Sequence, residues 1–368
     1  MESPRHSIEA FCSITRTSPN VAKLYLNENS GNVQNALADF YRMESSTHLN
    51  GSELKKRGIE LKMPMKTTSC LDPSFPHMDL VQALIPEIGM SVKKLPLSLQ
   101  VNQLPLDLRI AVFISAMTSG SSHFQIAKHF SIPPAIVLPV ILDVSQAFND
   151  SLDFPKLSSQ LLRNVATKIE RRTRFPRAAG LIAVCGSFIT LSDVDGIIVA
   201  AELLAPYPYR VCDVIKSKWE KFLPNPEFLG TSAQKVGFRL IFHGHLCDCK
   251  TTYASFSSGY YSPRPSKKQE CYNDILLPLQ RESLKISRSF WRFQPALDKL
   301  PAESKLDVTL ACLHLLSFVE KNSKLSLFKE EMGRFNNMYY TTYSRPSKDP
   351  DRQAVAEYLH QKWSYRGS

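Results

Sequence analysis

Apolar residues recur at helical spacing near the start of the chain, and polar breaks divide them into three segments. Ser18 can cap a second helix, and Pro19 suits its first turn. Asn29-Ser30-Gly31 is a typical helix stop, after which Asn32 can cap a third helix. The apolar positions with this spacing are Phe11, Ile14, Ala22, Tyr25, Leu26, Val33, Ala36, Leu37 and Phe40. The pattern predicts a three-helix module over residues 6–44.

A longer helical region is expected over residues 76–155, beyond a linker at 45–75 that has no sustained period. Apolar positions from Leu106 to Met117 predict a helix that ends near Gly120. The inward positions of a helix-turn-helix follow at Ile126, Ala127, Phe130, Ile132, Val137 and Val140. Its second helix, expected over 135–143 with Pro139 interrupting it, has no Lys, Arg, Asn or Gln. Because such side chains read base edges, a packed helix pair is favoured over a DNA reader.

Short apolar runs of strand type follow this region. They lie at residues 181–184, 188–191, 197–201 and 238–242, and Asp193–Gly196 suits a hairpin turn. Helices return from residue 272, the run 306–319 is apolar nearly all round and should be buried, and a last helix is expected near 354–363. The sequence therefore predicts an α+β or α/β fold, with one domain over 156–320 and a tail over 321–368.

Composition and charge narrow the classes of partner that the protein is expected to bind. Forty-five Lys and Arg oppose thirty-four Asp and Glu, a formal charge of +11 that favours polyanionic partners, nucleic acid first. No apolar run approaches the roughly 18–20 residues of a membrane span, so no membrane partner is expected. The N-terminal residues do not resemble a secretory signal, so the eight cysteines are expected to be reduced thiols in the nucleus or cytoplasm.

The basic surplus is concentrated in residues 155–180, which hold seven basic residues and one acid. An amphipathic helix there would bury Leu161, Val165 and Ile169 on one side. The candidate nucleic-acid-binding residues are Lys168, Arg171, Arg172, Arg174 and Arg177. They could hold phosphates without reading sequence, and the alternative is a solvated charged face.

Metal-ligand side chains also cluster at His243, His245, Cys247 and Cys249. If this run were a strand, the four would share one face but span about 20 Å, too far for one tetrahedral zinc ion. Only a bent loop could gather them. The alternative is that they are plain surface or core residues.

The string FCSITRTSPNVAKLYLNENSGNVQNALADFY resembles a UBA-like domain, similar to the N-terminal modules of p97 cofactors and tyrosyl-DNA phosphodiesterases. The resemblance implies ubiquitin or a p97-type protein as partner. Thr15-Arg16-Thr17 stands where the family usually has a Met-Gly-Phe-type loop. The alternative is a generic three-helix capping module.

A second resemblance covers about residues 100–320. LPLDLRIAVFISAMTSGSSHFQIAKHFSI, RFPRAAG, DVDGIIVAAELLAPYPYRVCDVIKS, PEFLGTSAQ, SLKISRSFW and DVTLACLHLLSFV are similar, in order, to phrases of PIF/Harbinger transposases and their domesticated nuclease relatives of the DDE superfamily. The resemblance implies an RNase H-like core with a preceding helix-turn-helix and appended helices. It also implies a nuclear location and a Myb/SANT-like partner protein.

That family cleaves phosphodiesters with carboxylates that hold divalent ions such as Mg²⁺. The resemblance places its three acidic positions at Ala183, Asp213 and Ser287, so one carboxylate remains. Glu282 falls on a different helix face from Ser287, and Asp193 and Asp195 are expected to form the hairpin turn.

We therefore expect no cofactor and an inactive, nuclear, nucleic-acid- or chromatin-associated adaptor. One alternative is a residual metal-dependent nuclease that uses Asp213 and retains Mg²⁺. The other is a pure protein-interaction scaffold with a ubiquitin-binding module.

Overall fold

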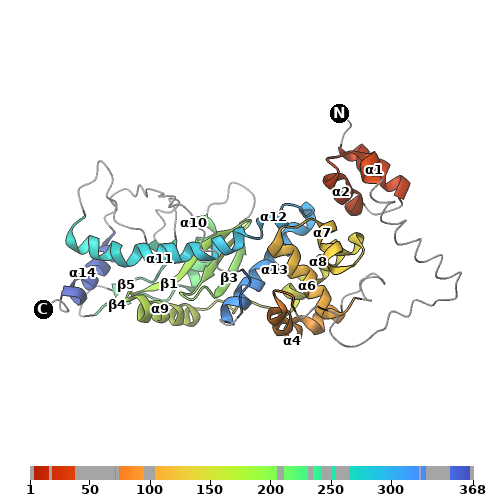
Figure 1. Ribbon diagram of the computed structural model, residues 1–368. Helices are drawn as coiled ribbons and strands as arrows, with labels where there is room; N and C mark the ends of the chain where they lie inside the picture. Colours follow the sequence, from red (N-terminus) through yellow and green to blue (C-terminus); the bar gives the residue numbers. More distant parts are fainter. Residues whose placement is uncertain are drawn as a thin grey trace.

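The chain forms an elongated molecule, with a lobe built on a β-sheet at one end and a lobe of helices at the other (Figure 1). A small N-terminal module lies beside the helical lobe, and the last helix of the chain lies at the far end of the sheet lobe. The computed structural model describes residues 4–15, 19–37, 71, 74–94, 104–204, 211–230, 235–242, 251–253, 265–322, 325–328 and 349–364.

The N-terminal module begins with α1 (Pro4–Thr15) and α2 (Pro19–Glu28), and a third helical segment covers 33–37. The second helix begins at the proline that the sequence indicated. It ends where Gly31 has a positive φ of 79°, and the Asn32 carboxamide oxygen accepts from the Asn35 N–H at 3.1 Å. The buried side chains of the module are Phe11, Ala22, Tyr25, Leu26 and Ala36. The predicted start of the second helix at Pro19 and its stop at Gly31 are confirmed; Ser18, Phe40 and residues 45–70 of the predicted linker lie outside the described residues.

The helical lobe is organised around α8. Its helices are α4 (Met78–Lys94), α6 (Leu106–Ser119), α7 (His123–Phe130), α8 (Pro134–Ser151), α12 (Gln294–Leu297) and α13 (Ala302–Lys321). α8 packs against α4, α6, α7 and α13, so it is covered on most sides. α13 is buried nearly all round, as its composition predicted, and its main partner is α8 rather than the sheet.

The predicted helix-turn-helix is present as α7 and α8, which meet at 95°. Ser122 and Gln125 form a capping box at the start of α7, and Ser131 ends it with a φ of 54°. The expected boundaries of the second helix were wrong: it runs through Pro139 to Ser151. A proline inside a helix costs about 3 kcal/mol, and burial of α8 among four neighbouring helices outweighs that cost.

The sheet contains the four predicted strands. Its members are β1 (Ala178–Cys185), β2 (Phe188–Ser192), β3 (Ile198–Leu203), β6 (Arg239–Phe242) and β7 (Thr252–Tyr253), in the order β3-β2-β1-β6-β7. β1, β2 and β3 are successively antiparallel, and β6 and β7 run parallel to β1. A separate two-stranded sheet pairs β4 (Glu227–Phe228) with β5 (Lys235–Val236).

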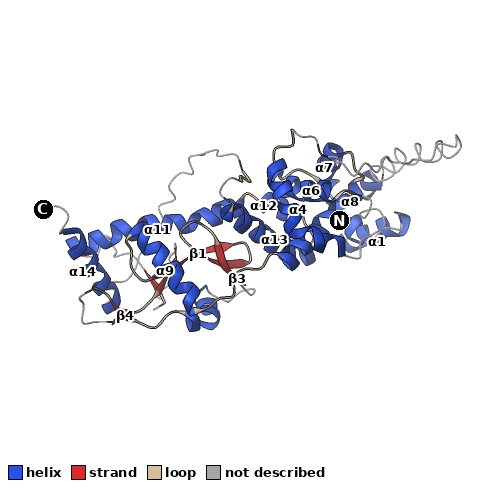
Figure 2. Cartoon of the chain, turned by 90° about the horizontal axis from the view of Figure 1, so that it is seen from below, coloured by secondary structure: helices blue, strands red, loops and turns tan. Residues whose placement is uncertain are grey.

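Helices cover both faces of the large sheet. α9 (Ser159–Thr173) and α11 (Lys267–Trp291) both pack against β1, on opposite sides of the sheet in the two views (Figures 1 and 2). Val165 and Ile169 of α9 are buried as predicted, together with Leu162, whereas Leu161 is only half-buried. Between β3 and β4 the chain forms α10 (Val211–Val214), the π-helical turn η1 (Ile215–Trp219) and the 3-10 turn η2 (Glu220–Phe222).

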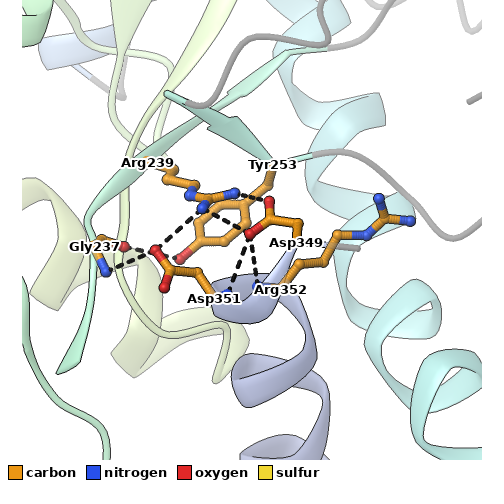
Figure 3. Close-up of polar contacts among 6 residues, drawn as sticks. All are labelled: Gly237, Arg239, Tyr253, Asp349, Asp351 and Arg352. Atoms are coloured by element: carbon orange, nitrogen blue, oxygen red, sulfur yellow. Dashed lines mark hydrogen bonds and ion pairs between the residues drawn. The ribbon is translucent and has the colours of Figure 1, made fainter. Parts of the chain in front are cut away.

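The predicted C-terminal helix is part of the sheet lobe. It forms α14 (Pro350–Ser364), which packs against α11 and β5 and buries Val355, Ala356 and Leu359. A polar cluster fixes its first turn to β6 (Figure 3). The Arg239 guanidinium donates to both carboxylate oxygens of Asp349 and to Asp351 at 3.1 Å.

No single helix in the described part of the chain is long and apolar enough to cross a membrane; α7 and α8 satisfy that criterion only as a bent pair.

Cys12, Cys185, Cys271 and Cys312 are free thiols, as expected. Cys212 is disulfide-bonded, so the expectation of reduced cysteines was wrong for this residue.

Candidate functional site

Two of the three positions that the resemblance assigns to catalytic acids lie together where α11 crosses β1. The Ser287 hydroxyl donates to the Val184 carbonyl oxygen at 3.0 Å, and the Thr190 hydroxyl donates to the Ala183 carbonyl oxygen at 3.3 Å. Burial raises the pKa of the Cys185 thiol to about 12, although hydrogen bonds with Thr190 and Ser287 oppose the shift. A methyl group, two hydroxyls and a neutral thiol therefore meet at this point.

Asp213, the second position, lies on a different element. It is exposed on α10, and its backbone carbonyl accepts a hydrogen bond from the Ser217 hydroxyl at 2.7 Å. α10 packs chiefly against η1, whereas Ala183 and Ser287 belong to β1 and α11. The structure thus brings the first and third predicted positions together and places the remaining carboxylate on a separate helix.

The residues at this crossing do not fit a magnesium ion. Mg²⁺ requires oxygen ligands that include carboxylates, and neither Ala183 nor Ser287 supplies one. Within the residues that the structure describes, no group of three or more His, Cys, Asp and Glu side chains could hold a metal ion. The cluster His243, His245, Cys247 and Cys249 lies outside those residues.

A cavity of about 150 Å³ lies nearby, between the hairpin turn and helices α11 and α13. Its charged lining comprises Arg172, Asp193, Asp195, Glu282, Lys285 and Glu320. Asp193 forms the turn as expected, because its carboxylate accepts from the backbone N–H groups of Asp195 at 2.9 Å and Ile197 at 3.0 Å. Glu282 is ion-paired with Lys285. Three of the four acids of this cavity, Asp193, Asp195 and Glu282, are therefore occupied by internal contacts.

The convergence of these acids was missed by sequence reasoning. Burial raises the pKa of Glu320, the Asp193 carboxylate adds to the shift, and the Lys285 ammonium opposes it. These residues lie far apart along the chain, and no local motif links the hairpin to the two helices. Only the packing of α11 and α13 on the sheet lobe places them side by side.

The basic segment on α9 is largely neutralised by acids of the protein itself. Lys168 lies 2.5 Å from the Asp193 carboxylate and 2.6 Å from that of Asp195. Arg172 also pairs with Asp195. The same turn that separates β2 and β3 therefore supplies counterions to two of the five predicted phosphate-binding residues.

The other three predicted phosphate-binding residues, Arg171, Arg174 and Arg177, differ from one another in their contacts. Arg177 pairs with Glu227 at 2.7 Å and donates to the Phe228 carbonyl oxygen at 2.8 Å. Arg174 ends α9 with a φ of 66°. Arg171 is exposed, and no ion pair joins it to a described residue. The segment thus presents less uncompensated charge than its sequence indicates.

The N-terminal module is docked on the helical lobe. The rings of Phe11 and Tyr25 stack with centroids 5.7 Å apart inside the module. The Tyr25 ring also meets Phe124 of α7 edge-to-face at 5.2 Å, and Lys23 lies 3.7 Å from Glu303 of α13. Since Tyr25 is buried, one aromatic side chain contributes both to the module's core and to its docking contact.

We expect Phe124→Ala to loosen the module without unfolding the lobe. An edge-to-face aromatic pair is worth about 1 kcal/mol beyond burial, so backbone amides of α2 should exchange about five-fold faster with solvent. Hydrogen exchange followed by mass spectrometry measures this change. Phe130→Ala on the same helix is the control, because Phe130 contacts Phe75 and His129 instead. Equal exchange of α2 in both variants would contradict the docking contact.

Comparison with known proteins supports the identification of the N-terminal module. Residues 5–47 match the family model of the UBA-like domain. No curated protein and no solved structure matches the chain. The matched region covers α1 from its second residue onward, all of α2 and the helical segment 33–37. The predicted UBA-like module is therefore confirmed in position and helical structure.

Proposed function

We propose that this protein is a non-catalytic nuclear adaptor that binds ubiquitin through its N-terminal module and associates with nucleic acid through its larger region. The observation that carries the proposal is the match of residues 5–47 to a UBA-like domain, a module that often binds ubiquitin. The module has a formed core in the structure, with Phe11 and Ala22 fully buried.

We further propose that the sheet lobe is an RNase H-like core derived from a Harbinger-type transposase. In an RNase H-like core, a trio of antiparallel strands is extended at its first strand by parallel strands, and helices cover both faces. The order β3-β2-β1-β6-β7, with α9 and α11 on the two faces, supports this assignment. The ordered phrases of the sequence that resemble the transposase supply the second support.

Loss of catalysis is proposed from the ligands available where α11 crosses β1. Two-metal phosphodiester cleavage requires carboxylates that clamp both ions, and Ala183 and Ser287 offer a methyl group and a hydroxyl. The hydroxyl is itself hydrogen-bonded to the strand, at 3.0 Å from the Val184 carbonyl oxygen. The RNase H-like frame would then serve as a scaffold for binding.

The proposed ubiquitin contact is tested in the full-length protein by titrating it into isotope-labelled ubiquitin and following amide shifts. We expect saturable shifts with a dissociation constant in the micromolar range. Thr17→Asp should weaken binding about ten-fold or more, because it places a carboxylate where the family has its Met-Gly-Phe-type segment, and burying a charge at a contact is costly.

Asn27→Asp is the matched control. It adds the same charge to the same module, at an exposed position about 12 Å further along α2. Binding by the control and loss of binding by Thr17→Asp support the proposal. If the unmodified protein causes no ubiquitin shifts at high micromolar concentration, the ubiquitin function is wrong.

A further inference from the structure

The outward face of α11 changes its charge halfway along the helix. At about 100° per residue, Arg281, Lys285, Arg288 and Arg292 fall within an arc of about 60°, directly opposite the buried stripe. The same face carries Glu270 and Asp274 in the first half of the helix. All four cationic residues are exposed. The C-terminal half of α11 therefore presents a basic stripe about 16 Å long. The helix itself runs along the sheet lobe (Figure 1).

Internal acids compensate this stripe only in part. Lys285 pairs with Glu282, and the Arg292 guanidinium lies 4.8 Å from the centroid of the Phe328 ring. No ion pair joins Arg281 or Arg288 to a residue in the described part of the chain. This contrasts with α9, where Lys168 and Arg172 are neutralised by the hairpin turn. The helix dipole favours cations only in the last turn, so it does not account for Arg281.

An exposed aromatic ring lies at the same end of the stripe. Trp291 follows Arg288 by three residues, so the two side chains are neighbours on the helix surface. The Trp291 side chain is 59% exposed, although tryptophan is usually well covered in a folded protein. Cationic side chains beside an exposed aromatic ring are the combination that holds a nucleic-acid backbone while a base stacks.

We propose that the C-terminal half of α11 binds single-stranded nucleic acid, with Arg281 and Arg288 contacting successive phosphates and Trp291 stacking on a base. This inference rests on the proposed nucleic-acid association and assigns it a surface and a strand form. A duplex is a poorer partner, because its bases are already stacked and offer Trp291 no free face. The stripe is independent of the ubiquitin-binding module.

The test measures fluorescence anisotropy of a labelled single-stranded oligothymidylate of about 12 nucleotides with the full-length protein. We expect Arg281→Gln/Arg288→Gln to bind about ten-fold more weakly and to lower the slope of log affinity against log salt by about 1.4, the value for two lost phosphate contacts. Trp291→Ala should bind roughly five-fold or more weakly without changing that slope.

Lys267→Gln/Lys268→Gln is the matched control, because it removes the same charge from the same helix about 20 Å from Arg281. Unchanged binding by the control supports the proposal. Equal losses in control and stripe variants overturn it, as does a loss only in Arg171→Gln/Arg172→Gln, which would assign the nucleic acid to α9. Binding of the oligonucleotide with no effect of any stripe variant leaves the proposed association intact and refutes this surface.

Two competitors separate other anionic partners. Displacement of the oligonucleotide by polyglutamate or by phosphatidylserine vesicles at equal charge concentration would show a generic anion surface and overturn the proposal. A duplex of the same length that binds as tightly as the single strand, with no dependence on Trp291, would also overturn the proposal. Absence of binding to every nucleic acid would refute both this inference and the proposed nucleic-acid association, while ubiquitin binding would still be tested separately.

Discussion

Replacing Arg239 with methionine is expected to lower the free energy of unfolding of the sheet lobe by about 3–5 kcal/mol. Only 9% of the Arg239 side chain is exposed, and it bridges β6 to the start of α14 (Figure 3). Burial disfavours the charged forms of both Arg239 and Asp349. The hydrogen bond and the opposite charge that each residue offers the other outweigh this effect, so the pKa of Arg239 is raised and the pKa of Asp349 is lowered. Without the guanidinium, Asp349 and Asp351 face each other as partly buried, unpaired carboxylates.

Urea unfolding measures the loss, and hydrogen exchange should show α14 exchanging first. Arg171→Met is the control, since Arg171 is exposed and its replacement should change stability by no more than about 0.5 kcal/mol. The double variant Arg239→Met/Asp349→Leu should recover part of the loss, because it removes the uncompensated charge as well. A double variant less stable than the single one would contradict an electrostatic origin.

The elements of the fold were predictable where apolar spacing and turn chemistry agree locally. The hairpin between β2 and β3 follows from Asp193–Gly196, and the start of α2 follows from Pro19. The length of α8 was mispredicted, since Pro139 is a local signal that the surrounding helices override. The anchoring of α14 could not be foreseen, because Arg239 meets Asp349 across more than a hundred residues.

The candidate sites show the same limit of local reasoning. Ala183 and Ser287 lie on a strand and a late helix that pack on each other, and both elements were recognisable in the sequence. The basic residues of α9 were visible as a charge run, but their counterions come from a hairpin that is distant in sequence. The cationic stripe of α11, by contrast, has a regular helical spacing that is visible in the sequence itself.

Acidification from about pH 6.5 toward pH 4 is expected to destabilise the helical lobe through its two buried histidines, His123 and His314. Burial and the charge of Lys299 lower the pKa of His123 to about 4. Burial likewise lowers the pKa of His314 to about 4; Asp153 opposes the shift, and Lys321 adds to it. Both histidines are neutral in the folded protein and become charged in the unfolded chain below about pH 6.5.

The direction of this pH dependence follows from the linkage between proton binding and folding. Because the folded pKa lies below the unfolded one, the stability contribution is complete above about pH 6.5 and is lost as the pH falls toward 4, by about 3 kcal/mol for each histidine. Two carboxyl groups of the lobe, those of Asp143 on α8 and Glu320 on α13, act in the opposite direction, because burial raises the pKa of each. Burial raises the pKa of Asp143 to about 6, although Arg109 opposes the shift, so protonation of Asp143 favours the folded state in the same range. Asp143 is only half-buried and is expected to offset part of one histidine term.

Urea midpoints measured between about pH 7 and pH 4.5 should therefore fall steeply, and His123→Gln or His314→Gln should each flatten the dependence. His129→Gln is the matched control, because it replaces an exposed histidine on the same helix as His123. His314 stacks on Phe154 with ring centroids 4.3 Å apart, so His314→Gln should also lower stability at neutral pH, whereas the slope reports the titration alone. If both buried-site variants kept the slope of the unmodified protein, carboxylate protonation rather than histidine charging would govern acid unfolding of this lobe.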